Sequence, residues 1–323
     1  MVITSYTILM KSKTNPIYDL IIIGTGPAGL AASIYASRYG LKHLLIGILK
    51  GGTATEAFRI ENYPGFISIP GNELMQKFIE HVKQYDPKII SAELKSIEKQ
   101  KNYFKVKDEL DKTFKGKTVI LALGVHHRTL SIVGEKKFLG KGVSYCHTCD
   151  GPLFKDKIVG VVGGGDGALT AALFLSKHAK KVYLIHRRKE FRGQVAWQNS
   201  VEQEKKIIKI LQRQVKEIRG DNFVKEIILD LPYQTKKSLK LDGLFIEIGS
   251  LPSGGKIIFK SPLNLKRDKL NYIITDRLMQ TNIPGIFAAG DITSPPEKLR
   301  QILTASSEGS IAADSVQRFL IKR

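Results

Sequence analysis

Apolar residues mark a strand, a turn, a helix and a second strand near the start of the chain. Residues 19–23 form a short, mostly β-branched apolar run that stops at glycine, as a buried parallel strand does. Residues 30–39 then place apolar side chains at helical spacing until Gly40, and residues 41–46 have the pattern of another strand. The pattern predicts a βαβ unit.

The same order returns in the middle of the chain. Residues 157–162 are predicted as a strand, 168–177 as a helix and 182–185 as the next strand. A third block has a strand over 283–291, which ends in Gly-Asp, and a helix over 302–320 rich in small residues. Because the third block has no glycine-rich turn of its own, we predict an α/β fold with two Rossmann-like dinucleotide-binding domains, one inserted into the other.

The predicted domain limits follow from this order. Residues 1–17 are an N-terminal extension, in which Met10 is an alternative start. Residues 18–126 and 253–323 form the outer domain, and residues 127–252 form the inserted domain. The N-terminus has no secretion signal, and no apolar run reaches the roughly 18–20 residues of a membrane span. We therefore expect a cytoplasmic protein that is not embedded in a membrane.

Two glycine-rich turns lie between a predicted strand and a predicted helix, where such turns bind a dinucleotide. Glycine permits the tight turn and the close approach of the backbone to a pyrophosphate, whose charge the helix N-terminus attracts. An ordinary strand–turn–helix is the less specific alternative. The first turn comprises Gly24, Thr25, Gly26, Pro27, Ala28 and Gly29, and the second comprises Gly163, Gly164, Gly165, Asp166, Gly167 and Ala168.

The residues after the two units differ from the usual NAD pattern. An acidic residue about 20 positions beyond such a turn commonly holds a ribose hydroxyl. Leu49 stands near that place after the first turn. After the second, the predicted strand ends in a basic segment that suits the 2′-phosphate of NADP, because guanidinium groups bind phosphate in a bidentate manner. A solvated charged face is the alternative for this segment, which contains His186, Arg187, Arg188 and Arg192.

The only two cysteines of the chain form a CxxC motif with Cys146 and Cys149, followed by Asp150. Thiols in such a motif tend to have a lowered pKa and to exchange disulfides. A protonated Asp150 would serve that exchange as an acid, if burial raises its pKa, although a plain turn residue is the alternative. With His147 the cysteines would make an incomplete zinc set, so we predict no metal site.

The composition is that of an ordinary globular protein, apart from its charge. The 323 residues are 42% hydrophobic and carry a net charge of +21. The lysines are scattered along the chain, which favours a solvated surface over a binding tract, while attraction to an acidic partner remains the alternative. No zinc-finger spacing or RNP aromatics are present, so we predict no nucleic-acid partner.

Taken together in this order and spacing, these motifs resemble those of the low-molecular-weight thioredoxin reductases of bacteria and archaea. The resemblance covers about residues 18–320 and depends most on a CxxC followed by Asp-Gly just before the second glycine-rich turn. Further matching pieces are Glu61-Asn62-Tyr63-Pro64-Gly65, the His186–Arg192 segment, Gly290-Asp291 and Arg300-Gln301.

The resemblance implies FAD in the outer domain and NADPH in the inserted domain. Electrons would pass from NADPH to the flavin, then to the Cys146–Cys149 disulfide, and then to a thioredoxin or thioredoxin-like protein. Cys149 would face the flavin, Cys146 would attack the partner, and Asp150 would protonate the leaving thiolate. A rotation of the inserted domain and a homodimer are also implied. Besides the first turn, the implied FAD contacts are Gly51, Gly52, Thr53, Asn62, Gly290, Asp291 for the ribityl chain, and Arg300, Gln301 and Ile302 near the isoalloxazine ring.

Three residues depart from the pattern of the family. Leu49 and Thr53 stand where Glu and Gln are frequent, and Gly167 stands for a frequent Ser. The adenosine contact of FAD and one hydrogen bond to the NADPH pyrophosphate are therefore in question. Two other functions stay open: a related flavoprotein reduced by acidic ferredoxin, which the +21 charge favours, and a nucleotide-binding sensor with idle cysteines.

Overall fold

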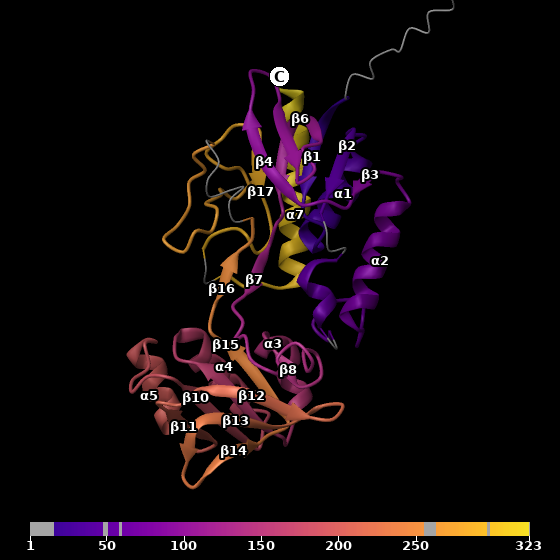
Figure 1. Cartoon of the computed structure of the whole chain (residues 1–323). Coiled ribbons are helices and arrows are strands. Elements are labelled where there is room, and N and C mark those ends of the chain that lie inside the picture. The colour runs from indigo at the N-terminus through magenta and orange to yellow at the C-terminus, as the bar shows by residue number, and fades with distance from the viewer. Residues whose placement is uncertain (1–15, 48–50, 58–59, 255–262, 296–297, 323) are drawn as a thin grey trace, which may run out of the picture.

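The protein is described here by a computed structural model, which covers residues 16–47, 51–57, 60–254, 263–295 and 298–322. Two bodies lie one above the other and are joined by a narrow waist (Figure 1). The first body, called the outer body, contains both ends of the described chain, and the second, called the inserted body, is built from the middle. The two-domain α/β architecture predicted from the sequence is confirmed.

The outer body is built on a sheet with the strand order β3-β2-β1-β6-β5-β4, to which β17 adds by pairing with β6. Strands β1, β2, β3, β6 and β17 run parallel, and β4 and β5 extend the sheet as antiparallel strands. The elements are β1 (Ile17–Ile23), α1 (Pro27–Arg38), β2 (His43–Ile46), η1 (Gly52–Glu56), α2 (Gly71–Lys83), β3 (Lys88–Ile90), β4 (Leu94–Lys99), β5 (Phe104–Asp108), β6 (Thr113–Leu121), β17 (Ile286–Ala288) and α7 (Ile302–Ile321).

Alternation along β1 divides the core of the outer body into two layers. Leu20 and Ile22 pack with residues of α1 and α7 on one face of the sheet. Ile21 and Ile23 pack on the other face, against β4, β5 and β6. All four side chains are buried, and burying such a side chain contributes about 1.5–3 kcal/mol. The apolar run that predicted a buried parallel strand is thus explained by cover on both faces.

Helix α7 packs on α1 through small residues. Ala312 and Ala313 are fully buried, and a Cβ added to Gly309 would lie 2.0 Å from the Ala28 carbonyl oxygen. The helix predicted from these small residues is confirmed, and its close approach is made to the backbone of α1. This contact matters for function because α1 begins directly at the first glycine-rich turn.

The inserted body repeats the parallel plan. Its main sheet has the order β11-β10-β9-β15-β8, and a three-stranded sheet with the order β12-β13-β14 packs beside it. Helix α4 covers the main sheet on the other face. The elements are β8 (Val143–Ser144), α3 (His147–Asp150), η2 (Gly151–Phe154), β9 (Ile158–Gly163), α4 (Asp166–Ser176), β10 (Lys181–His186), α5 (Val195–Gln203), β11 (Ile207–Leu211), β12 (Val215–Gly220), β13 (Val224–Tyr233), β14 (Lys236–Lys240) and β15 (Gly243–Glu247).

The chain crosses between the bodies twice, in β7 (Val125–His127) and β16 (Ser250–Pro252). These two strands pair with each other as an antiparallel ribbon at the waist (Figure 1). We propose this ribbon as the boundary between the domains, which agrees with limits at 126/127 and 252/253.

Several predicted elements differ from the observed ones at their ends. Helix α1 begins at Pro27 and α4 at Asp166, two or three residues earlier than predicted, because each helix starts immediately at its glycine-rich turn. Strand β17 is shorter than predicted, since Pro284 and the positive φ of Gly285 precede it and Gly290 follows it. The N-terminal extension, except its last two residues, lies outside the described part of the chain.

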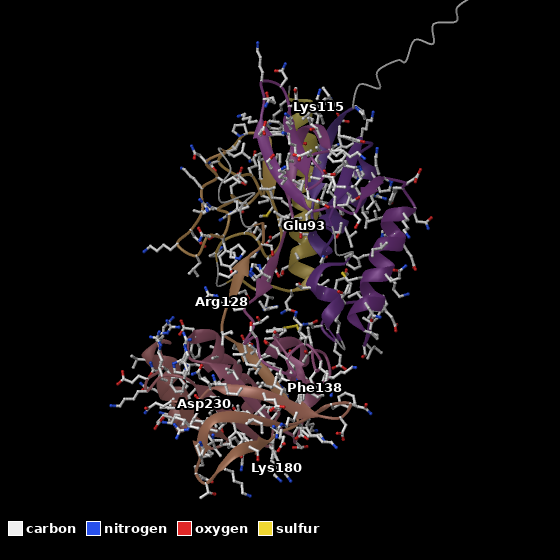
Figure 2. The ribbon with its side chains drawn as sticks, in the orientation of Figure 1. Glu93, Lys115, Arg128, Phe138, Lys180 and Asp230 are labelled. Atoms are coloured by element: carbon white, nitrogen blue, oxygen red, sulfur yellow. A yellow bond between two sulfur atoms is a disulfide. The ribbon has the colours of Figure 1, made fainter. Side chains whose placement is uncertain are left out.

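Charged side chains project around both bodies, with Lys115 on the outer body and Lys180 on the inserted body (Figure 2). This distribution matches the scatter of lysines along the sequence. Within the described residues, no helix has the length and apolar character needed to cross a membrane.

Candidate redox and dinucleotide site

The two cysteines are joined as a disulfide, with their Cα atoms 5.3 Å apart. Cys146 precedes α3 and caps it, because the Cys149 backbone N–H donates a hydrogen bond to Cys146 Sγ at 3.2 Å. The Ser144 hydroxyl accepts a hydrogen bond from the Cys146 backbone N–H at 3.0 Å. Both sulfurs are half-buried. The short helix therefore holds the pair in one local geometry, with a backbone donor on Cys146.

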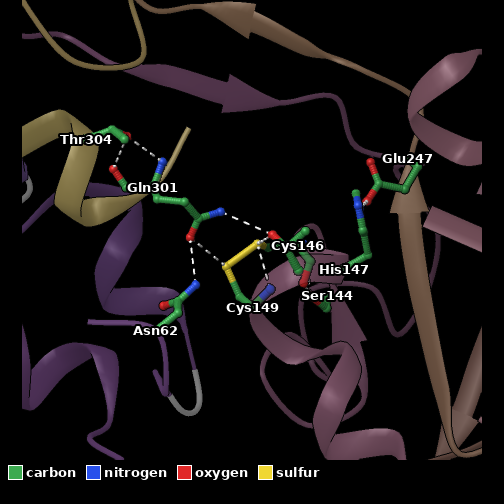
Figure 3. Close-up of a disulfide and its surroundings, with 9 residues drawn as sticks. Asn62, Ser144, Cys146, His147, Cys149, Glu247, Gln301 and Thr304 are labelled. Atoms are coloured by element: carbon green, nitrogen blue, oxygen red, sulfur yellow. Dashed lines mark hydrogen bonds and ion pairs between the residues drawn. A yellow bond between two sulfur atoms is a disulfide. The ribbon is translucent and has the colours of Figure 1, made fainter. Parts of the chain in front are cut away.

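The disulfide lies between the two bodies (Figure 3). Gln301, the N-cap of α7 in the outer body, has its Oε1 atom 3.7 Å from Cys149 Sγ. The same oxygen accepts a hydrogen bond from Asn62 Nδ2 at 3.0 Å, and Gln301 Nε2 donates to Thr148 Oγ1 at 3.1 Å. Gln301, which was predicted only as a flavin contact, thus contacts α3, and Asn62, predicted in the same way, is hydrogen-bonded to Gln301.

Asp150 lies at the end of α3 and is 9% exposed. Burial raises the pKa of its carboxyl group, and a hydrogen bond with Ser144 opposes this effect in part. Its Oδ1 atom is buried without a hydrogen-bond partner among the described residues. A carboxyl group with a raised pKa next to a dithiol is suited to donate a proton at near-neutral pH.

His147 and Glu247 form a hydrogen-bonded pair that the sequence analysis did not identify. Nδ1 of His147 and Oε1 of Glu247 are 2.7 Å apart, and both side chains are mostly buried (Figure 3). Glu247 ends β15 beside the second glycine-rich turn, where a Cβ on Gly163 would lie 2.3 Å from its carbonyl oxygen. The pair ties the redox helix to the dinucleotide-binding turn, and no local pattern signals a partner 100 positions away.

The first glycine-rich turn has the close backbone packing expected of a phosphate cradle. Gly24 has φ +119°, and a Cβ on Gly29 would lie 1.9 Å from the Gly24 carbonyl oxygen. Gly26, the N-cap of α1, has no side-chain cap, so the first N–H groups of α1 remain for another acceptor. Gly51 N–H donates to Thr25 O at 2.7 Å, and Gly52 contacts Gly26. The structure therefore brings the two glycine segments predicted for FAD together.

Asp291 follows Gly290, shortly after the end of β17. Burial raises the pKa of its carboxyl group, and the positive charges of Lys298 and Arg300 oppose this rise in part. The Arg300 guanidinium lies over the Tyr272 ring, 4.4 Å from its centre. A mostly buried ion pair supports this turn, since Glu308 accepts from Gly290 N–H at 2.8 Å and binds Lys298 at 2.8 Å. This supporting pair was also missed from the sequence, because Lys298 and Glu308 are ten positions apart and come from a loop and a helix.

The remaining residues that were predicted to contact FAD in the outer body have no contact with other described residues that bears on the site. Thr53 is exposed in η1, and Ile302 is partly buried at the first position of α7. Leu49 lies outside the described residues, so its effect on the adenosine contact stays a prediction.

The second glycine-rich turn leads from β9 into α4 at Asp166. Gly165 has open space around its Cβ position, and Ala168 is fully buried under Gly163. Gly164 packs against the His186 ring, where a Cβ would lie 2.2 Å from Cε1. Gly167 lies in the first turn of α4. The turn therefore has an uncovered backbone at Gly165, and the His186 ring packs against it at Gly164.

The arginines predicted to bind a 2′-phosphate follow β10, at the same edge of the sheet as this turn. Arg187, Arg188 and Arg192 are exposed, and Arg192 N–H donates to Gly164 O at 2.7 Å. None of the three forms a salt bridge with an acidic side chain in the part of the chain that the structure describes. Their charges are therefore available to a phosphate.

Similarity to known proteins agrees with this geometry. Residues 18–309 match the family described as pyridine nucleotide-disulphide oxidoreductase. The chain is 39% identical over 316 residues to a thioredoxin reductase of Listeria monocytogenes, with 96% of each chain covered. It superposes on the crystal structure of a thioredoxin reductase of Streptococcus pyogenes with a TM-score of 0.89 at 37% identity, which covers 96% of this chain and 100% of the other.

A third comparison is with another solved structure. A thioredoxin reductase of Lactococcus lactis, solved in the FR conformation, is 35% identical and covers 95% of this chain and 100% of its own. Its TM-score is only 0.64. The identity is nearly equal in the two structural comparisons, at 37% and 35%. The chain belongs to the pyridine nucleotide-disulphide oxidoreductase family and, within it, to the low-molecular-weight thioredoxin reductases.

Proposed function

We propose that the protein uses NADPH to reduce the disulfide of a thioredoxin or thioredoxin-like protein, through FAD and the Cys146–Cys149 pair. The observation that carries the proposal is the position of this disulfide between two bodies, each with its own glycine-rich dinucleotide turn. The outer body would hold FAD along Gly24–Gly29, Gly51, Gly52 and Asp291, and the inserted body would hold NADPH.

Bound FAD would supply the chemistry that converts a hydride from NADPH into two electrons for a disulfide. The residues of the chain supply the rest. Cys149 lies nearer the outer body, next to Gln301, and is therefore the sulfur that faces the flavin. Cys146 has the backbone N–H of Cys149 as a donor, which stabilises a thiolate there for attack on the partner. Asp150 provides the proton for the thiolate that leaves when the disulfide of the partner protein is broken.

The same disulfide cannot stay beside the flavin and also meet a protein partner. The similarity to the FR-conformation structure, at a much lower TM-score, supports a rotation of the inserted body about the β7–β16 ribbon. Rotation would expose Cys146 and bring the nicotinamide to the flavin. We also propose a homodimer in the cytoplasm, on the basis of the family alone.

NADPH is favoured over ferredoxin as the donor because Arg187, Arg188 and Arg192 are exposed beside the second glycine-rich turn. The net charge of +21 favours the ferredoxin alternative, so the choice requires a test. A nucleotide-binding sensor without catalytic activity would not need a disulfide between its two dinucleotide turns.

The test is to purify the protein, record its flavin spectrum without oxygen, and add NADPH or NADH. We expect NADPH to bleach the flavin and to support reduction of a thioredoxin disulfide. Bleaching without reduction of any thioredoxin would contradict the proposed activity, and bleaching only by reduced ferredoxin would establish the alternative. The Cys146→Ser protein is the control, since it keeps both nucleotide sites.

A further inference from the structure

A chain of hydrogen bonds crosses from the outer body to the disulfide. Asn62 Nδ2 donates to Gln301 Oε1 at 3.0 Å, which fixes the orientation of the Gln301 amide. The Nε2 group of Gln301 therefore faces the inserted body, where it donates to Thr148 Oγ1 at 3.1 Å. The Thr148 hydroxyl oxygen lies 3.4 Å from Cys146 Sγ.

The direction of the last bond follows from the state of the sulfurs. A sulfur in a disulfide carries no hydrogen, so the Thr148 hydroxyl must be the donor to Cys146 Sγ. The hydroxyl oxygen already accepts from Gln301, which leaves its hydrogen for the sulfur. Cys146 Sγ thus has two donors, since the Cys149 backbone N–H is the other, at 3.2 Å.

The second sulfur has the opposite surroundings. The polar atom of the outer body next to Cys149 Sγ is the carbonyl oxygen of Gln301, at 3.7 Å. An acceptor disfavours negative charge on this sulfur but can receive a hydrogen bond from a Cys149 thiol. The two sulfurs are therefore polarised in opposite directions, with a thiolate favoured on Cys146 and a thiol favoured on Cys149.

We propose that Gln301 is a positioning residue which acts through Thr148 to make Cys146 the sulfur that leaves as thiolate when the disulfide is reduced against the outer body. The inference rests on the proposed function, in which reduced FAD supplies the two electrons. Those electrons and one proton break the S–S bond and leave a Cys146 thiolate and a Cys149 thiol. We call the chain Asn62–Gln301–Thr148 the interdomain relay.

The relay exists only while the two bodies are docked. Asn62 and Gln301 belong to the outer body, and Thr148 belongs to α3 of the inserted body. Rotation of the inserted body would break the bond between Gln301 and Thr148 and free the hydroxyl. The hydroxyl would then still donate to Cys146 Sγ but more weakly, because it no longer accepts from the Gln301 amide. A less stabilised thiolate is a stronger nucleophile, so Cys146 would be stabilised when it is formed and more reactive when it meets the partner.

The test measures the dithiol–disulfide equilibrium of the FAD-loaded protein in dithiothreitol redox buffers. Alkylation with a maleimide polymer reports the equilibrium without interference, because the chain has only two cysteines. The variants are Thr148→Val, which keeps the shape without the hydroxyl, Thr148→Ser, which keeps the hydroxyl, Gln301→Leu, and the double variant Thr148→Val/Gln301→Leu. FAD content is measured for each.

We expect Thr148→Val to shift the equilibrium about tenfold toward the disulfide, which is about 30 mV for a two-electron couple. Thr148→Ser should stay within about twofold of wild type, and Gln301→Leu should shift it about threefold in the same direction. The double variant should match Thr148→Val alone, because the amide acts only through the hydroxyl. In addition, the share of Cys146 in limited iodoacetamide labelling should fall in Thr148→Val.

A wild-type equilibrium in Thr148→Val, or additive shifts in the double variant, would overturn the relay. If Gln301→Leu loses FAD, the contrast between Thr148→Val and Thr148→Ser still decides the role of the hydroxyl. These readouts do not need a protein substrate. An altered equilibrium in a protein that reduces no thioredoxin would therefore support the relay and contradict the proposed function.

Discussion

Replacing Gly309 by alanine should separate the stability of the outer body from that of the inserted body. The added Cβ would lie 2.0 Å from the Ala28 carbonyl oxygen and 2.8 Å from the Ala28 carbonyl carbon. Both are backbone atoms of α1, so α1 and α7 must move apart by more than 1 Å to restore ordinary contacts of about 3.4 Å. Overpacking of this kind costs up to about 3 kcal/mol, and the better helix propensity of alanine offsets about 1 kcal/mol.

The net loss of about 2 kcal/mol corresponds to a fall of roughly 4–8 °C in the midpoint of thermal unfolding. The midpoint is measured for the outer body by the loss of flavin, which is predicted to bind there. The fluorescence of Trp197, the only tryptophan, reports the inserted body because the residue lies in α5. We expect the tryptophan transition to stay within about 1 °C of wild type. FAD affinity should fall about tenfold, since Ala28 belongs to the first glycine-rich turn.

Gly167→Ala is the matched control, because this helical glycine has only the Glu247 carboxylate near its Cβ position, at 3.7 Å. Its midpoint should stay the same or rise slightly. An unchanged midpoint and unchanged FAD affinity in Gly309→Ala would refute the packing argument, as would a fall of both transitions together.

Three further outcomes follow from the site. Cys146→Ser and Cys149→Ser should each abolish thioredoxin reduction while NADPH still bleaches the flavin. Only Cys146→Ser should show a long-wavelength thiolate–flavin band, which grows as the Cys149 thiol ionises at alkaline pH; the reverse spectra would exchange the roles of the two sulfurs. Replacing both Arg187 and Arg188 by alanine should weaken NADPH binding by about 1.5–3 kcal/mol for each charged hydrogen bond that is lost, which raises the KM for NADPH strongly. The KM for NADH should change little in the same steady-state assays. Burial raises the pKa of Asp150, so its contribution to stability is present below the pKa of the unfolded chain and is lost as the pH rises through the pKa of the folded protein. In urea titrations, Asp150→Asn should therefore gain stability relative to wild type between acid and neutral pH. The same substitution should slow dithiol turnover.

The sequence predicted the features that depend on nearby residues. Both glycine-rich turns were placed correctly between strand and helix, because the apolar run before each and the glycines themselves are local signals. Helix ends were less accurate, since α1 begins at Pro27, inside the turn. The CxxC motif was interpreted as a redox pair from its spacing and from its place between the two glycine-rich turns, and the disulfide is present.

Contacts between segments that are distant in the chain could not be predicted from the sequence. Gln301 and Thr148 are 153 positions apart, and their hydrogen bond depends on how the two bodies are placed. The His147–Glu247 pair joins residues 100 positions apart. Nothing in the spacing of polar residues signals such a pair, because each of these side chains also suits a solvated position in its own segment.

The way the bodies meet explains why a rotation is feasible. Within the described residues, each hydrophobic cluster belongs to a single body, so no apolar cluster spans the waist. Domains without a large hydrophobic interface are expected to move relative to each other. The Gln301–Thr148 hydrogen bond contributes about 0.5–1.5 kcal/mol, which changes the docked population only about twofold to tenfold. Coupling of this kind is reciprocal, so a relay that stabilises the Cys146 thiolate in the docked state is itself strengthened when reduction of the disulfide forms that thiolate. The interdomain relay therefore couples the redox state of Cys146 and Cys149 to the docking of the two bodies.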